Sequence, residues 1–516
     1  MSRLERTVTN FKIGGLIYVI SLLVTLFTRK VFIEYLGDDL VGLSTMMTNV
    51  LGFFSLAEAG ISGAVFYALY KPLYDNDRQL VSQIMTLFGW LYRKVGLFIL
   101  AAALVLSLFL TYIFRNAEVA DGYIYASFFV FLFSSLLGYF VNYKQLLIAA
   151  DQRNYIVMGY LNGCNLVKFI IQAVCLVKTD WGYPLWLFWE VVFALVNSWL
   201  LTRRVKRDYG WLEVDMAQGR EMMHKFPDVM KRAKQVFAHN VSTFVASQTD
   251  NILIFFFASL QWITIFGNYV LITSKLAQFV YTLLNNSNAT VGNLIAEGDE
   301  QKTYRVFWQF MALRYLMGVT FIFGLARLTS PFITICVGED YLLDGATFTM
   351  MLVYTFITLT RATVDTYLSG FGLYQDVWAS LTEAALNLVI SLIAGFAWGL
   401  KGVVFGTMVS MILLVFLWKP YFLFSRGFGR SVWDYWKNMA LYIGCGAVMF
   451  ILLNGLFDRL LPTAPSNYLE WTVQALIQCG AMFVGYGVLL YVATRGMREL
   501  FRVWWNLMLG ILRRNS

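Results

Sequence analysis

The chain has 516 residues, of which 59% are hydrophobic and 14% are charged, and its formal net charge is +9. A soluble domain carries about a quarter of its residues as charged side chains, so an ordinary soluble protein is excluded. Apolar runs of about 18 residues or more recur along the sequence, and each can cross the hydrocarbon core as a helix. Long uniform runs, rather than short alternating ones, also exclude a membrane β-barrel.

These runs predict an all-α polytopic membrane protein with about fourteen transmembrane helices. The predicted spans lie at about residues 12–34, 41–70, 84–114, 122–148, 154–177, 183–202, 237–258, 262–293, 306–328, 345–370, 377–398, 402–424, 438–457 and 470–494. The first run has no small-residue cleavage site and leads directly into the second, so we expect no cleavable signal peptide.

The distribution of Lys and Arg predicts the orientation. If the N-terminus is inside, most loop Lys and Arg fall on the inner side, which places both termini in the cytoplasm. The richest basic loop contains RRVKRDYG (203–210) and MKRAKQ (230–235). No nucleic-acid-binding module accompanies it, so attraction to anionic lipid headgroups is favoured. The segment 497–514 has the pattern of an interfacial amphipathic helix.

The basic loop also predicts the domain organisation. The turns YDNDRQ and AEGDEQK each follow a long second helix in the two halves, and this echo indicates two pseudo-symmetric lobes. The predicted parts are an N-lobe (1–202), a basic cytoplasmic connector (203–236), a C-lobe (237–424), two additional spans (438–494) and the C-terminal interfacial helix (497–514).

The loops and motifs argue against an enzyme. The longest outer loops, about 329–344 and 458–469, are too short for an enzyme domain, and Glu339-Asp340 is better explained as an acidic cap on a connector. No Walker A motif occurs, so ATP is not the direct energy source. The five cysteines form no CxxC pair, and the two histidines have no ligand partner at helical spacing, so we expect no metal site and no cofactor. A transporter or flippase is the predicted class.

Few charged residues remain within the predicted spans. Each costs about 2.5–3.5 kcal/mol at the centre of a helix, so it must face a cavity or a partner. Basic residues outnumber acidic ones, which predicts a cavity with positive potential that attracts a large anion such as a pyrophosphate. These residues are Arg29, Lys30, Glu58, Arg93, Lys94, Lys168, Glu190, Asp250, Lys275, Arg314, Arg361, Asp365 and Glu383.

Two stretches resemble a known family. Residues 29–96 contain an Arg at the end of the first span, then LG, Gly-Leu, the L-x-E-x-G of LAEAG, LYKPL, and Tyr-Arg in the third span. TDNILIFF (249–256), GNYVLI (267–272) and VGNLIAEGD (291–299) follow in matching order. Residues 10–310 thereby resemble the Wzx-type polysaccharide flippases of the multidrug/oligosaccharidyl-lipid/polysaccharide exporter superfamily. The region after 330 does not match closely.

The resemblance implies a V-shaped, two-lobed bundle in the bacterial cytoplasmic membrane. It implies alternating access that moves undecaprenyl-pyrophosphate-linked oligosaccharide repeat units, for O-antigen or capsule, from the inner to the outer leaflet. It also implies a monomer that works beside polysaccharide polymerase and chain-length proteins. The two spans after 424 are typical of lipid II relatives rather than of the Wzx type.

The candidate site residues follow from the buried charges and the resemblance. The cationic lumen is predicted to comprise Arg29, Lys168, Lys275, Arg314 and Arg361. The lumen acids, with proton or sodium coupling left open, are predicted to be Glu58, Asp250 and Asp365. Arg361 and Asp365 are also spaced to pair with each other on one helix, and Glu58 has the alternative role of an interhelical tether.

Three alternative functions stay open. A lipid II flippase would share the fold and the charge pattern. A multidrug antiporter would need an acidic or apolar pocket for cations, which the basic bias argues against. A membrane polysaccharide polymerase or ligase belongs to a different class and would transfer sugar in purified form.

Overall fold

The computed structural model describes residues 24–515 apart from 56–59, 116, 232, 234–248, 285–290, 293, 296, 374–376 and 462–463. In these residues the regular secondary structure is entirely helical, which confirms the all-α prediction. The chain divides into two compact units, residues 1–264 (unit 1) and 265–516 (unit 2).

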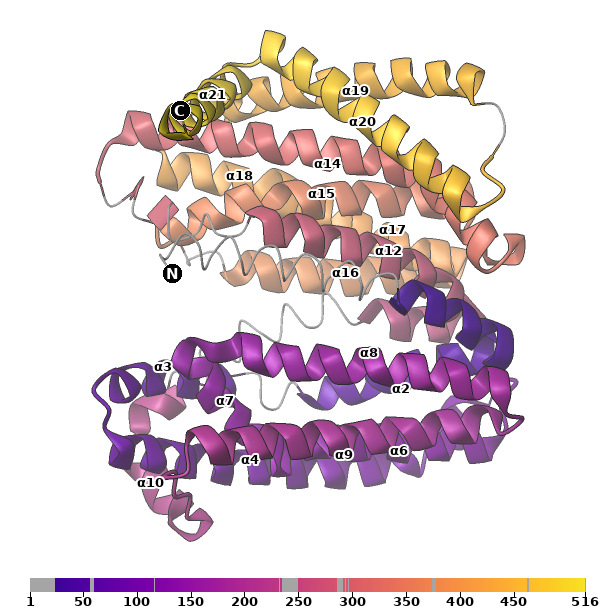
Figure 1. The fold of residues 1–516 in the computed structure, drawn as a ribbon, viewed down its shortest axis with the longest axis vertical. Helices are drawn as coiled ribbons and strands as arrows, with labels where there is room; N and C mark the ends of the chain where they lie inside the picture. Colours follow the sequence, from indigo (N-terminus) through magenta and orange to yellow (C-terminus); the bar gives the residue numbers. More distant parts are fainter. Residues whose placement is uncertain are drawn as a thin grey trace. The chain divides into compact units, whose positions relative to one another are not determined.

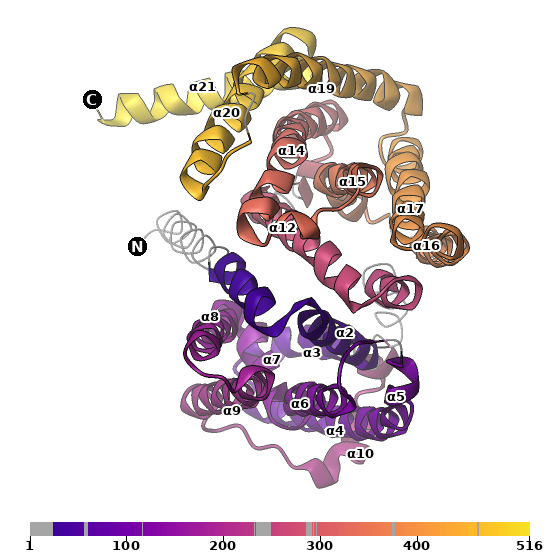
Figure 2. The same ribbon diagram turned by 90° about the vertical axis from the view of Figure 1, so that its right-hand side faces the viewer.

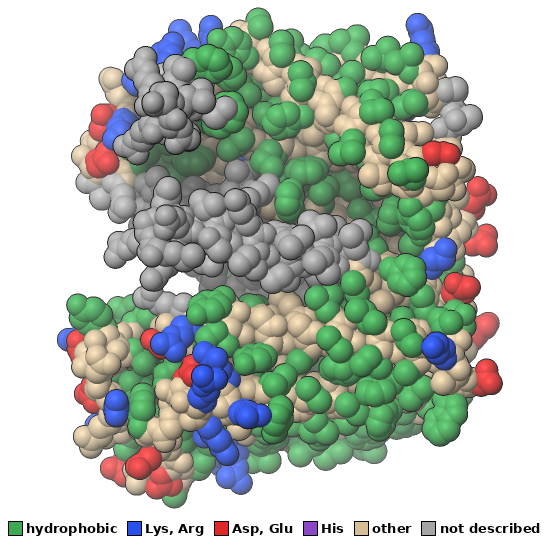
Figure 3. Space-filling view, in the orientation of Figure 1, with side chains coloured by type: hydrophobic (Ala, Val, Ile, Leu, Met, Phe, Trp, Pro, Cys, Tyr) green, Lys and Arg blue, Asp and Glu red, His purple; other side chains and the backbone are tan. Residues whose placement is uncertain are grey.

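Eleven helices among the described residues are long and apolar enough to cross a membrane. Each coincides with a predicted span, so the chain is a multi-pass membrane protein. The other three predicted spans, 12–34, 41–70 and 237–258, lie partly outside the described residues. Glu58, within the second of these spans, is not among the described residues. Hydrophobic side chains cover much of the visible face of each unit (Figure 3).

Unit 1 is built from antiparallel helices and short turns (Figure 1, Figure 2). Its elements are the helical residues 24–36, α2 (Asp38–Ser55), α3 (Ile61–Tyr74), α4 (Arg78–Ser107), α5 (Leu110–Ile113), α6 (Asp121–Phe140), η2 (Asn142–Lys144), α7 (Gln145–Ile148), η3 (Ala149–Arg153), α8 (Asn154–Lys178), α9 (Gly182–Asp208), η4 (Met216–Gln218), α10 (Gly219–Lys225) and the helical residues 249–257.

The described part of the basic connector packs onto α4. The Lys225 ammonium donates to the Gln83 side chain over 2.8 Å. A Cβ on Gly219 would lie 2.2 Å from the Trp90 side chain, so only glycine permits this approach of α10 to α4. The division between the two units falls at residues 264 and 265, within α12.

Unit 2 contains the longest helix of the described chain, α14, whose neighbours are α15, α19, α20 and α21 (Figure 2). Its elements are most of α12 (Leu260–Leu284), α14 (Glu300–Cys336), η5 (Glu339–Tyr341), α15 (Gly345–Gly370), α16 (Val377–Trp398), α17 (Leu400–Ser410), η6 (Met411–Trp418), α18 (Lys419–Phe422), η7 (Leu423–Gly427), α19 (Val432–Leu460), α20 (Tyr468–Ala493) and α21 (Arg495–Asn515).

Aromatic side chains form the core of unit 2 around α14. Trp308 stacks on Tyr442 of α19 with an interplanar angle of 7°. Phe307 meets Tyr367 of α15 edge-on at 5.1 Å between ring centroids. Such pairs contribute about 0.5–1.5 kcal/mol beyond their buried area, so they fix α15 and α19 against α14.

Two glycines bring α16 and α17 into direct backbone contact. A Cβ on Gly402 would lie 2.0 Å from the Ala394 carbonyl oxygen, and one on Gly406 would lie 2.1 Å from the Ser391 hydroxyl oxygen. Small residues four apart allow this close packing in membrane helices. The Ser391 hydroxyl also donates to the Val403 carbonyl over 3.0 Å, which joins the two helices by a hydrogen bond.

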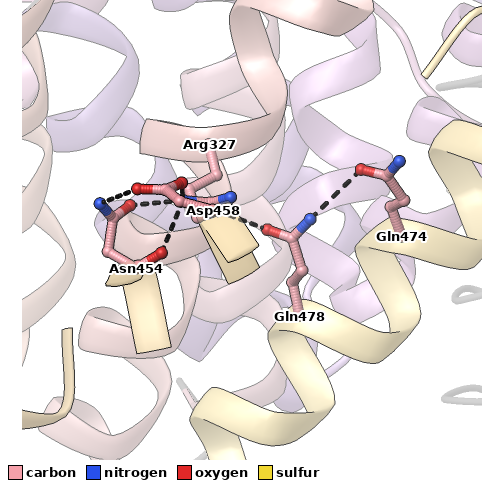
Figure 4. A network of polar contacts seen from close by, with 5 residues as sticks. All are labelled: Arg327, Asn454, Asp458, Gln474 and Gln478. Atoms are coloured by element: carbon pink, nitrogen blue, oxygen red, sulfur yellow. Dashed lines mark hydrogen bonds and ion pairs between the residues drawn. The ribbon is translucent and has the colours of Figure 1, made fainter. Parts of the chain in front are cut away.

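A polar network fastens the last two spans to α14 (Figure 4). Arg327 donates to the Gln478 side chain over 2.7 Å and pairs with Asp458 over 2.7 Å. Asn454 also accepts from Arg327 and donates to Asp458. Because α14, α19 and α20 each contribute to it, this network ties the two additional predicted spans to the rest of unit 2.

Candidate functional site

A cavity of about 390 Å³ lies among α12, α14 and α15 of unit 2, with polar side chains set in a mostly apolar surface. Most of the polar residues that line it carry a hydroxyl group. Arg314 of α14 is the one charged residue among the lining residues. Its polar lining residues are Thr273, Ser274, Gln278, Tyr281, Arg314, Tyr354, Thr355 and Thr358. Hydroxyl and amide groups beside a guanidinium can bind an anion that also carries sugar hydroxyls.

Arg314 is buried, with 4% of its surface exposed. In the described part of the chain, no carboxylate oxygen lies within 4.0 Å of its guanidinium. Among the described residues, Tyr281 and Asp365 interact with it electrostatically. Buried charges usually have a direct partner, so this arrangement leaves the guanidinium available to a ligand in the cavity.

Asp365 lies at the centre of a charge cluster next to the cavity. Its carboxylate accepts from Lys419 of α18 over 2.8 Å and pairs with Arg361, one turn away on α15, over 3.3 Å. Glu383 of α16 interacts electrostatically with Arg361 and Lys419. The cluster therefore holds three basic groups, counting Arg314, and two acidic groups.

The cluster and the cavity share one face of α15. Thr358, Ala362 and Asp365 are spaced four and three residues apart, which places them on the same side of a helix. Thr358 and Ala362 line the cavity, and Asp365 follows one turn later. The surplus of positive charge is therefore adjacent to the hydroxyl lining.

Lys419 belongs to this charge cluster but is not among the site residues predicted from the sequence. It lies between two π-helical segments, η6 and η7, in an otherwise apolar span. The following Pro420 has no N–H, so it cannot continue the α-helical hydrogen-bond ladder. π-helical turns are rare and are often found at functional sites. The Lys-Pro pair within an apolar run is the sequence signal that marks this position.

In unit 1, Lys168 is already paired. Its ammonium lies 2.8 Å from a carboxylate oxygen of Glu190, and the two side chains are 11% and 10% exposed. The Gln172 amide donates to the other Glu190 oxygen over 3.0 Å. The pair thereby joins α8 to α9, so its charge is compensated inside unit 1.

Of the remaining predicted residues, Arg29 and Asp250 belong to unit 1 and Lys275 belongs to unit 2. Arg29, in the helical residues 24–36, donates to the Thr264 carbonyl over 3.4 Å. Asp250 lies in the helical residues 249–257 and Lys275 lies in α12, and both are partly buried. Glu58 lies outside the described residues. Of the eight predicted residues, Arg314, Arg361 and Asp365 are thus brought together.

No family model matches the chain, and no curated protein matches it in sequence. Solved structures of membrane transporters do match its fold. The helical membrane-transporter fold expected from the sequence is thereby supported, whereas the superfamily and the Wzx-type assignment still rest on the motifs alone.

The lipid II flippase MurJ in an inward-closed conformation matches with a TM-score of 0.66 and 15% identity, over 93% of this chain and 98% of that chain. An inward-facing MATE family multidrug resistance transporter of the MOP superfamily matches with a TM-score of 0.57 and 16% identity, over 77% of this chain and 93% of that chain. One of these proteins is a flippase and the other is a multidrug transporter, and this chain shares their fold.

Proposed function

We propose that the protein is a flippase that moves an undecaprenyl-pyrophosphate-linked oligosaccharide from the inner to the outer leaflet of the bacterial cytoplasmic membrane. The observation that carries the proposal is Arg314, a buried guanidinium without an ion pair among the described residues, on a cavity lined by hydroxyl groups. A pyrophosphate would supply the missing negative charge through charge-assisted hydrogen bonds.

The neighbouring charge cluster supports an anionic substrate. The cluster contains three basic side chains, Arg314, Arg361 and Lys419. The two acidic side chains, Asp365 and Glu383, do not balance them, so a formal surplus of positive charge remains. The cavity volume of about 390 Å³ suits a diphosphate and an adjoining sugar rather than a whole repeat unit. The lipid chain and the remaining sugars then lie outside the cavity.

The proposal includes both termini in the cytoplasm and work beside polysaccharide polymerase and chain-length proteins. Asp365, held between Arg361 and Lys419, is the described acid that a coupling proton or sodium ion would engage. Arg29, Lys275 and Asp250 are proposed to contact the substrate or the coupling ion during transport.

Depletion of the protein in its source bacterium tests this function. Single lipid-linked repeat units should accumulate on the cytoplasmic leaflet, and surface polysaccharide should be lost. Accumulation on the outer leaflet would mean that the missing step is polymerisation or ligation, and it would overturn the flippase proposal.

A lipid II flippase is the second candidate, favoured by the larger share of the chain that matches MurJ, 93% against 77% for the multidrug transporter. Complementation of a strain depleted of its lipid II flippase separates the two candidates. Rescue of growth would assign lipid II as the substrate. A multidrug antiporter is tested by dye efflux, which we expect to be unchanged because the described cavity is basic.

A further inference from the structure

Unit 1 contains a pocket of its own, of about 410 Å³. The span expected to reach residue 148 ends earlier, because α6 stops at Phe140 and the chain continues through short 3-10 and α turns. These turns leave space beside the last turns of α9. Asn142, Lys144 and Gln145 line one side, and Lys206 and Tyr209 line the other.

Two lysines without a carboxylate partner face this pocket. Burial and the nearby Lys206 ammonium lower the pKa of Lys144 below its ordinary value. Among the described residues, no carboxylate oxygen lies within 4.0 Å of either ammonium group. The pocket therefore concentrates uncompensated positive charge.

The acidic side chains near this pocket are already engaged. Asp208 pairs with Arg204 over 2.9 Å and with Arg153 over 3.4 Å. Asp151 accepts from the Tyr209 hydroxyl over 2.7 Å and also pairs with Arg153. Because these carboxylates are bound to arginines and a tyrosine, they do not neutralise the two lysines directly.

The same pocket contains two buried acceptors without partners. The side-chain oxygens of Asn142 and Gln145 are buried and accept no hydrogen bond from any residue that the structure describes. The Asn142 amide nitrogen donates to the Ser198 hydroxyl over 2.9 Å, which holds the orientation of that side chain. A buried acceptor left unsatisfied costs about 1–3 kcal/mol, so a ligand that donates hydrogen bonds here would be favoured.

We propose that this pocket binds a phosphate ester that carries hydroxyl groups, with Lys144 and Lys206 on the phosphate and Asn142 and Gln145 accepting from the hydroxyls. A glycerol phosphate group has this chemistry, whether it belongs to a phosphatidylglycerol headgroup or to a soluble molecule. The pocket lies beside the last turns of α9, a helix long and apolar enough to span a membrane, which ends at Asp208. Lys and Arg side chains gather at this end of unit 1, near α7 and α10 (Figure 1, Figure 3).

The test uses the purified full-length protein in nanodiscs of phosphatidylcholine. Thermal unfolding is followed as phosphatidylglycerol replaces part of the lipid, and separately as soluble glycerol 3-phosphate or inorganic phosphate is added. The double variant Lys144→Gln/Lys206→Gln is compared with Lys302→Gln/Lys437→Gln, which removes the same charge from unit 2.

We expect the apparent affinity for the glycerol phosphate group to fall about tenfold or more in the Lys144/Lys206 variant and to be unchanged in the control. Gln145→Leu should remove the preference for glycerol 3-phosphate over inorganic phosphate and leave phosphate binding itself. Stabilisation by phosphatidylglycerol alone would assign a lipid headgroup, and stabilisation by the soluble ester would assign a free ligand. The proposal would be overturned if the ligand raised the unfolding temperature equally in both double variants. It would also be overturned if the wild-type protein were no more stable with either ligand than in phosphatidylcholine alone.

Discussion

The ammonium of Lys419 lies 2.8 Å from the carboxylate of Asp365, and this contact joins α18 to α15 across 54 residues of sequence. The Lys419 side chain is 16% exposed, so its charge is largely removed from solvent. The pair places a fixed carboxylate between two cations, Lys419 and Arg361, beside the cavity of unit 2.

We predict that Lys419→Met lowers the free energy of unfolding by about 2 kcal/mol, because it leaves Asp365 with Arg361 as its direct ion-pair partner. The matched control is Lys401→Met, because Lys401 lies in the same apolar span as Lys419 and pairs with Asp344. That pair is roughly half exposed, so its loss should cost about 1 kcal/mol or less. Thermal unfolding in detergent measures both, and equal losses would contradict a special role for Lys419.

Arg314→Met should reduce transport by at least about tenfold while the unfolding temperature stays the same or rises. The reason is that burying a guanidinium without an ion pair carries a desolvation penalty, and the apolar Met side chain does not incur it. Lipid-linked repeat units at the outer leaflet and thermal unfolding are measured on the same variant.

Arg305→Ala is the control for this prediction, because Arg305 also lies on α14 but is 59% exposed. Its transport should match wild type. If Arg314→Met transported normally at equal protein levels, the cavity would not be the anion site and the proposed mechanism would fail.

The Lys168–Glu190 pair should behave as a structural tether. Lys168→Met alone should lower the free energy of unfolding by about 3 kcal/mol, since it leaves a buried carboxylate uncompensated. The double variant Lys168→Met/Glu190→Leu should recover most of that loss and retain transport. A double variant that is stable but inactive would instead place Lys168 in substrate binding.

Gly402→Ala should destabilise the protein by about 2 kcal/mol or more, because its methyl group would overlap the Ala394 carbonyl. Gly444→Ala is the control, since no atom lies within 4 Å of the position of its added Cβ. Folded yield and unfolding temperature report both changes. Equal stability of the two variants would mean that α16 and α17 separate easily.

The fold could be predicted from the sequence because long apolar runs leave helices as the available spanning structure. The expected pairing of Arg361 with Asp365 is confirmed, since residues four apart on a helix are neighbours. The Lys-Pro pair marks Lys419 within the predicted span 402–424, but its contact with Asp365 could not be predicted because the two residues are 54 positions apart. The pairing of Lys168 with Glu190 could not be predicted for the same reason, because Glu190 lies on the next helix.

The close contact of α16 with α17 has a mechanical consequence. At Gly402 and Gly406 no layer of side chains separates the helices, and the Ser391 hydrogen bond to Val403 crosses the remaining space. One helix cannot slide along the other without driving a backbone carbonyl into its neighbour. Any rearrangement of unit 2 must therefore move α16 and α17 together as one rigid pair. Because α17 leads directly into the segment that contains Lys419, that segment would move with them.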